Sequence, residues 1–90
     1  MSKLNYFNSS ASEADIEKIH LFYNINGVNN ADNGKYDEAL EFFNKAIKIN
    51  PKDAVSYFNR ASVKMHLGDI KGARLDFKKA EKFKITDKYD

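Results

Sequence analysis

The sequence repeats itself with a period of 34 residues. Shifting residues 20–53 onto residues 54–87 brings identical residues together at seven positions, on an apolar pattern and beside the turns. The aligned pairs are Tyr23 and Tyr57, Gly34 and Gly68, Ala39 and Ala73, Phe43 and Phe77, Lys45 and Lys79, Ala46 and Ala80, and Asp53 and Asp87. A fixed period of this length is the size of one helix–turn–helix unit. The chain is therefore predicted to contain two copies of one structural unit.

The second half of the first unit reads as an amphipathic helix between two turns. From Tyr36 to Ile49 the apolar residues recur mainly at three- and four-residue steps, which places them on one helix face. Gly34 precedes this helix, where a left-handed residue would end an earlier helix, and Pro51 follows it, where a helix cannot continue. The alanines on either side of Phe43 would let two helix backbones approach closely around one large side chain.

This pattern resembles the tetratricopeptide repeat family, which has an aromatic residue, a Leu-Gly pair, a tyrosine, an Ala-x-x-x-Phe pair and a proline. The matching residues are Tyr23, Gly27, Gly34, Tyr36, Ala39, Phe43, Ala46 and Pro51 in the first unit, and Tyr57, Ala61, Gly68, Ala73, Phe77 and Ala80 in the second. The resemblance implies an all-α fold of two stacked helix–turn–helix repeats that form a short right-handed superhelix. Phe43 and Phe77 are then expected to be equivalent core side chains.

The sequence departs from the family pattern at a few positions. Asn26 and Asn30 stand where the family has a leucine and a large aromatic residue, and Arg60 and Lys64 take the same places in the second unit. Ile85 replaces the second proline. The first helix of each pair is therefore expected to pack less apolar bulk than usual, with moderate stability as the consequence.

The chain is predicted to consist of a flexible polar tail, residues 1–11, and a single helical domain, residues 12–90. Ser12 and Asp15 resemble a capping box, so the first helix starts early and extends the repeat at its N-terminus. Asp69 is expected to cap the last helix. The predicted helices are 12–33, 36–49, 53–67 and 70–84, and the final residues KITDKYD are too short for another full helix.

Composition argues against catalysis and against a membrane span. The chain has no cysteine, which excludes thiol chemistry and disulfides. Its two histidines, His20 and His66, lack metal-ligand spacing and are expected to be exposed on helix surfaces. The carboxylates are scattered and no glycine loop fits a phosphate. We predict a non-enzymatic protein with no metal or other cofactor, and a cytoplasmic one because no apolar run suits a membrane span or a secretory signal.

In the family, the first helices of successive pairs line a concave groove that receives a peptide or helix of a partner protein. The resemblance implies a groove here formed by Leu21, Asn24, Ile25, Val28, Val55, Phe58, Asn59, Ser62 and Met65. Because most of these side chains are apolar, an apolar or amphipathic peptide would suit the groove. Two alternatives stay open: the same side chains could complete the core, or the tail's own Leu4, Tyr6 and Phe7 could occupy the groove.

A second class of function, nucleic-acid binding or binding of an acidic partner, rests on charge. Residues 46–90 contain 11 basic and 6 acidic side chains, a net charge of +5. Lys71, Arg74, Lys78 and Lys82 lie along one side of the last helix and would be able to meet phosphates. A solvated lysine-rich face is the simpler interpretation, since that helix offers no obvious exposed aromatic side chain for stacking on bases.

A third class is structural, because stacked repeats bury the outer face of each unit against the next one. Apolar residues gather at the end of the second unit, where a third repeat would stack: Leu75, Phe83, Ile85 and Tyr89. We predict that a two-fold homodimer closes this end. The alternatives are that the C-terminal tail folds back to place Tyr89 against Phe83, or that the chain is part of a longer array.

Overall fold

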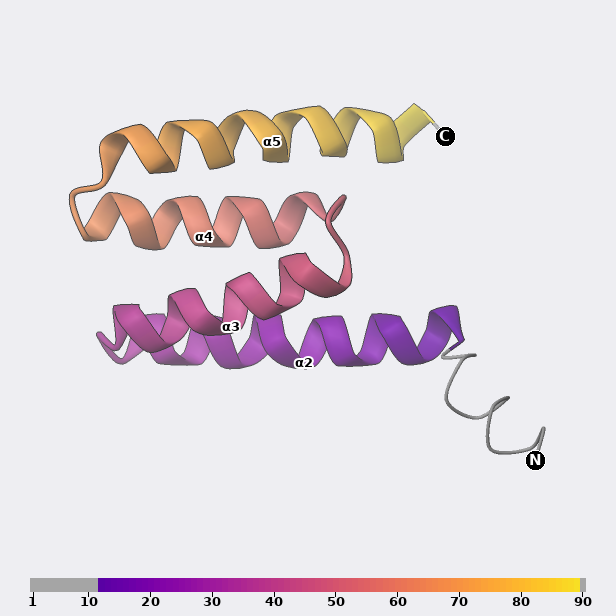
Figure 1. Cartoon of the computed structure of the whole chain (residues 1–90), viewed down its shortest axis with the longest axis horizontal. Helices are drawn as coiled ribbons and strands as arrows, with labels where there is room; N and C mark the ends of the chain where they lie inside the picture. The colour runs from indigo at the N-terminus through magenta and orange to yellow at the C-terminus, as the bar shows by residue number, and fades with distance from the viewer. Residues whose placement is uncertain (1–11, 90) are drawn as a thin grey trace.

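The computed structural model describes the backbone of residues 12–89 and the side chains of residues 12 and 14–84. This part of the chain contains four α-helices and no strand: α2 (Glu13–Asp32), α3 (Tyr36–Ile49), α4 (Ala54–His66) and α5 (Ile70–Tyr89) (Figure 1). The all-α prediction and the N-terminal extension are confirmed, since α2 begins seven residues before the first repeat. The predicted tail, with its Leu4, Tyr6 and Phe7, lies outside the described residues.

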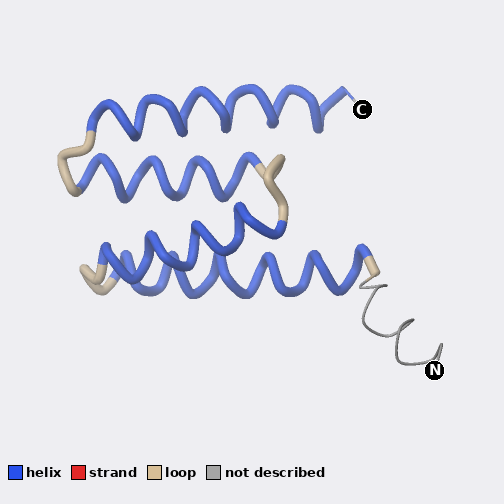
Figure 2. The backbone as a smooth tube through the Cα atoms, in the orientation of Figure 1, coloured by secondary structure: helices blue, strands red, loops and turns tan. Residues whose placement is uncertain are grey.

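The helices form two antiparallel pairs that are joined by short turns (Figure 2). α2 pairs with α3, and α4 pairs with α5. Figure 1 shows α4 between α5 and the first pair, with α3 overlying α2. α4 contacts α3 extensively and touches α2, so it covers one face of the first pair.

Both pairs turn through the same backbone motif. Gly34 and Gly68 have φ angles of 78° and 85°, the left-handed conformation that a residue without Cβ adopts at little cost. In each turn the glycine amide donates to the carbonyl three residues earlier, and the next amide donates to the carbonyl five residues earlier, at 2.8–3.0 Å. These bonds satisfy carbonyls at the end of the preceding helix. The sequence period is therefore also a period of structure.

The predicted helix starts are confirmed. Ser12 Oγ accepts from the Asp15 amide at 3.1 Å, and Asp69 Oδ1 accepts from the Gly72 amide at 2.9 Å. The predicted end of the last helix is wrong, because α5 continues to Tyr89. No proline interrupts it at Ile85, the position equivalent to Pro51.

The continuation of α5 also corrects the expectation for the C-terminal residues. A tail that folds back onto Phe83 would need the chain to turn after that residue. The backbone instead stays helical through residues 85–89. Fold-back of the tail is therefore not how this end is covered.

The core of the first pair is built around Phe43, which is 1% exposed. Its ring lies so close to the Cα of Gly27 that a Cβ there would overlap it. Ala39 of α3 and Val63 of α4 belong to the same buried cluster. In the second pair the flanking alanines are buried, but Phe77 itself is only half-buried. The expectation of two equivalent core phenylalanines is wrong, because α4 covers Phe43 and no described segment covers Phe77.

This difference predicts unequal costs for two matched truncations. Phe43→Ala should lower the free energy of unfolding by about 3–5 kcal/mol, because it leaves a cavity between three helices. Phe77→Ala should cost only about 1–2 kcal/mol, since part of its ring already contacts water. Urea titrations followed by circular dichroism measure both. Equal losses would show that Phe77 is as enclosed as Phe43.

Candidate functional site

A buried polar network joins α2 to the start of α4. His20 Nε2 lies 2.9 Å from Asp53 Oδ2 and 3.0 Å from Ser56 Oγ. Asn24 Nδ2 donates to Ser56 Oγ at 2.9 Å, and Asn59 Nδ2 donates to Asn24 Oδ1 at 3.3 Å. Asp53 Oδ2 also accepts from the Ser56 amide at 2.9 Å, which caps α4. The network fixes where α4 begins and how it sits on α2.

The burial of His20 contradicts the expectation that both histidines are exposed. His20 is 8% exposed, and its partners Asp53 and Ser56 lie where the first repeat meets the second. His66 is exposed, with its ring stacked on that of Tyr36 at a centroid distance of 5.1 Å. The burial of His20 could not be predicted from the sequence, because the apolar pattern of α2 does not indicate that α4 will lie over this position.

Five of the predicted groove residues meet in one hollow between α2 and α4. The hollow has a volume of about 270 Å³ and is lined by Asn24, Ile25, Val28, Asn29, Val55 and Asn59. Ile25, Val28 and Val55 are 50%, 38% and 58% exposed, so they are not core side chains. We call this surface the α2–α4 hollow.

The other predicted groove residues lie apart from this hollow. Leu21 is 58% exposed and lies one turn before Ile25 on α2. Ser62 lines a neighbouring hollow of about 190 Å³, together with Val28 and Asn59. Phe58 and Met65 lie on the side of α4 that faces α5. The predicted groove is thus divided between two sides of α4.

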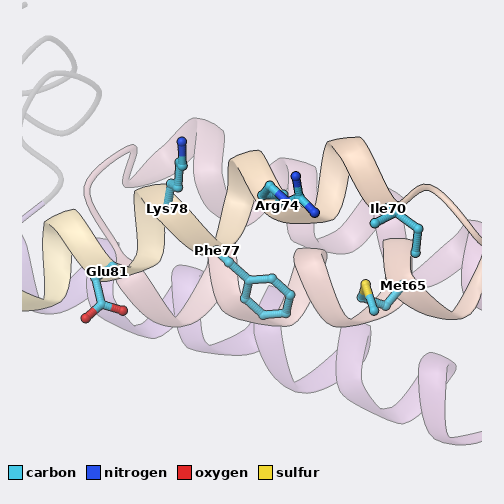
Figure 3. A pocket seen from close by; sticks show the side chains of 6 residues that line it. All are labelled: Met65, Ile70, Arg74, Phe77, Lys78 and Glu81. Carbon is cyan, nitrogen blue, oxygen red and sulfur yellow. The ribbon is translucent and has the colours of Figure 1, made fainter.

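A larger groove runs between α4 and α5. It consists of adjoining hollows of about 460 and 600 Å³ that share Phe77 and Glu81. Figure 3 shows the side chains that line the first hollow: Met65 on α4, and Phe77, Arg74 and Lys78 on α5. The lining side chains are Ala54, Val55, Phe58, Met65, Ile70, Arg74, Phe77, Lys78, Ala80, Glu81 and Lys84. We call this surface the α4–α5 groove; the sequence did not indicate it because Phe77 was assigned to the core.

Three charged side chains hold α4 against α5 on the side away from the groove. Arg60 donates to both carboxylate oxygens of Asp76 at 2.7 and 2.8 Å, and Lys64 Nζ lies 3.0 Å from Asp76 Oδ2. Arg60 Nη1 also donates to Asn44 Oδ1 on α3 at 2.8 Å. Arg60 and Lys64 occupy the places of the family's apolar residues, so an ion-paired contact replaces apolar packing there.

Asp76 is 3% exposed, and burial by itself would raise the pKa of its carboxyl. The hydrogen bonds from Arg60 and Lys64, with their positive charges, outweigh that effect and hold the pKa of Asp76 below its ordinary value. The same hydrogen bond raises the pKa of Arg60, although burial opposes it. The carboxylate therefore stays ionised in the folded state at neutral pH.

Only part of the residue set predicted to form a contact at the end of the second unit lies on the surface that the structure describes. Leu75 is 59% exposed on the outer side of α5. Phe83 instead packs on the Tyr57 ring of the same chain, with a centroid distance of 5.5 Å. The side chains of Ile85 and Tyr89 lie outside the described residues. Leu75 is thus the member of this set that the structure shows on the surface.

The described residues contain no group of three histidine, aspartate or glutamate side chains close enough together to hold a metal ion. No helix among them is both long enough and apolar enough to cross a membrane.

Comparison with known proteins identifies tetratricopeptide repeats over residues 31–84. The family described as "TPR repeat" matches residues 31–68, and the family described as "Tetratricopeptide repeat" matches residues 54–84. Tetratricopeptide repeat protein 36 of Danio rerio is 39% identical over 71 residues, which cover 79% of this chain and 38% of that protein. Its homolog in Nematostella vectensis is 43% identical over 71 residues, 79% of this chain and 39% of that protein.

A more distant relative is Photosystem I assembly protein Ycf3 of Acaryochloris marina, which is 26% identical over 80 residues, 88% of this chain and 48% of that protein. The chain spans about two fifths of the length of the two tetratricopeptide repeat protein 36 relatives. No solved structure matches the chain.

The Asp76 contacts predict a specific acid sensitivity. Because the folded-state pKa of Asp76 is depressed, the stability it contributes is present above its unfolded pKa of about 3.9 and is lost as pH falls through the folded pKa. Asp76→Asn should therefore lower the free energy of unfolding at pH 7 by about 1.5–3 kcal/mol. Below pH ~5 the free energy of unfolding of this variant should depend less on pH than that of the unchanged protein. Denaturant titrations across pH measure this.

Glu41→Gln is the control, since Glu41 is an exposed carboxylate on α3. It should retain the acid dependence of the unchanged protein. If Asp76→Asn and Glu41→Gln gave the same pH profile, the Asp76 pairs would contribute nothing measurable.

Proposed function

The chain belongs to the tetratricopeptide repeat family, and from this premise we propose that it binds an apolar or amphipathic peptide of a partner protein in the α2–α4 hollow. Repeats of this family generally mediate protein–protein interaction, and its members are generally non-catalytic scaffolds. The proposed role is accordingly non-enzymatic and needs no cofactor. A cytoplasmic location stays a prediction from the sequence.

The observation that carries this proposal is the exposure of three apolar side chains around one concavity. Ile25, Val28 and Val55 come from two different helices and are each more than a third exposed. Scattered apolar residues are common on protein surfaces, but apolar side chains that converge on a hollow are typical of a docking site. Covering them with an apolar side chain would remove this surface from water, which favours binding.

The polar side chains of the hollow support an apolar ligand over a charged one. The amides of Asn24 and Asn59 are hydrogen-bonded to each other, and Asn24 also bonds Ser56. These amides would therefore keep their hydrogen bonds within the chain when an apolar ligand binds. No charged side chain lines this hollow, so a charged ligand would find no opposite charge there. One relative is named as an assembly protein, which supports protein binding at this coarse level.

Self-association is the second candidate, and the observation that favours it is Leu75, a 59% exposed leucine on the outer side of α5. The predicted homodimer would have to rest mainly on this residue and on side chains beyond the described part, since Phe83 packs on Tyr57. Binding of RNA by Lys71, Arg74, Lys78 and Lys82 stays the least favoured proposal. Lys82 lies over the Phe83 ring of its own helix.

The proposal predicts which substitutions abolish peptide capture. Peptides that bind the unchanged chain would be selected from a displayed library of amphipathic helices, and their affinities measured by fluorescence anisotropy. Ile25→Lys and Val55→Lys should each weaken binding at least about tenfold, because each places an ammonium group where an apolar side chain docks. Helical content should be retained, as both positions are at least half exposed.

Leu75→Lys is the matched control: it makes the same chemical change at a position as exposed as Val55 but on another helix. It should leave affinity unchanged. Selected peptides that ignore Ile25→Lys and Val55→Lys would contradict the proposed site. Sedimentation of the unchanged chain and of Leu75→Lys over a dilution series reports the second candidate: a mass of 10.3 kDa at every concentration would rule out the homodimer.

A further inference from the structure

The first helix pair shows how one unit of this fold receives a helix. α4 covers the face formed by α2 and α3, and the contacts are specific in position. Val63 packs with Phe43 in the core, and His66 stacks on Tyr36. The guanidinium of Arg60, one turn before Lys64 on α4, donates to Asn44 Oδ1 at 2.8 Å. In addition to the polar network with α2, the face therefore accepts a helix through one apolar, one ring and one polar contact with α3.

The same face occurs 34 residues later and is the α4–α5 groove. Phe77, Ile70 and Lys78 stand at the positions of Phe43, Tyr36 and Asn44. No described segment lies on them: Ile70 is 47% exposed and Phe77 is half-buried, against 1% for Phe43. Because the backbone repeats from one unit to the next, the groove has the geometry that accepts α4 in the first unit.

The chemistry of this second face differs from that of the first. Three cations line the groove, Arg74, Lys78 and Lys84, against one carboxylate, Glu81, which leaves a net charge of +2. The ion pairs between described residues involve His20, Arg60 and Lys64 and neither Arg74 nor Lys78. Both cations line the groove, and they lie above the Phe77 ring in the view of Figure 3.

Asn44 accepts from a guanidinium in the first unit, whereas Lys78 would repel one in the second. The apolar positions change as well, since Phe58 stands where the first unit has Asn24. The Phe58 ring meets Phe77 edge-on at a centroid distance of 5.5 Å and is 54% exposed. A helix bound in the groove would therefore contact Phe58 where α4 contacts Asn24. It would contact Lys78 where α4 contacts Asn44.

We infer that the α4–α5 groove binds an amphipathic, acidic helix of a partner polypeptide in the register that α4 adopts on the first pair. α4 has 13 residues, so the bound helix has three to four turns. It carries apolar residues at the places of Asn59, Val63 and His66, opposite Phe58, Phe77 and Ile70. It carries a carboxylate at the place of Arg60, opposite Lys78. The α4–α5 groove shares Val55 with the α2–α4 hollow and has no other lining residue in common with it, and the inference does not depend on the proposed function.

A second copy of this chain fits the groove less well. Its α2 in the same register would place Asn29 over Phe77 and Asp32 over Ile70. Both contacts would set a polar side chain against an apolar one, which is unfavourable without a hydrogen-bond partner. A partner with apolar residues at these two places suits the groove better.

Two synthetic peptides test the inference directly. The acidic peptide has the sequence of residues 53–67 with Asn59→Leu, Arg60→Glu and His66→Leu, and the basic peptide is identical except that Arg60 is kept. Fluorescence anisotropy with the full chain at low salt should show the acidic peptide binding about tenfold more tightly, because only its carboxylate complements Lys78. With Lys78→Glu in the chain, the order of the two affinities should reverse.

Two variants locate the bound peptide. Ile70→Glu should weaken the acidic peptide at least about tenfold, whereas Ile25→Lys should leave its affinity unchanged; circular dichroism verifies that both variants keep their helices. Loss of binding with Ile25→Lys alone would place the peptide in the α2–α4 hollow and overturn this inference, without harm to the proposed function. No binding of the acidic peptide, or equal affinities of the two peptides, would also overturn it. So would a dimer of the unchanged chain that Ile70→Glu converts to monomer.

Discussion

The contact of the Phe43 ring with the bare Cα of Gly27 is the constraint on which the rest of the structure depends. A Cβ at Gly27 would overlap the ring, so α2 and α3 can approach this closely only with glycine at that position. Val63 then closes the ring from α4 and draws the second pair onto the first. Close packing of one large side chain among small ones gives each of the three helices a defined place.

Polar contacts determine the register in which that apolar contact is made. The network of His20, Asn24, Ser56 and Asp53 joins the middle of α2 to the first turn of α4. Each buried donor or acceptor in it has a partner, so a shift of α4 by one turn would leave several unsatisfied. On the far side of α4, Arg60 spans from Asn44 to Asp76 and ties α4 to both of its neighbours. The two hollows on either side of α4 are consequences of this fixed position.

The repeat period predicts most of the fold. The Ala-x-x-x-Phe spacing and the turn glycines are local signals for helices and for the turns between them. The sequence could not show that His20 is buried, since its partners Asp53 and Ser56 lie about one repeat length further along the chain. Likewise, an identical spacing around Phe43 and Phe77 concealed that only one ring is covered.

The residues of the candidate site could be predicted only in part from the sequence. Ile25, Val28 and Val55, which the family resemblance assigned to one groove, line one hollow in the structure. Phe58 and Met65 were assigned to the same groove but lie toward α5. A stripe at helical spacing gives a face of about 100°, which is too broad to tell which of two neighbouring helices a side chain at its edge will approach.

Native-state hydrogen exchange can measure whether coverage by α4, and not sequence, distinguishes the two repeats. Amides at matched positions, residues 43–47 in α3 and 77–81 in α5, lie in helices of similar sequence. If coverage determines local stability, the α3 amides exchange only through global unfolding, whereas the α5 amides exchange at least about tenfold faster through local opening of the uncovered unit. Equal protection of the two sets would contradict it.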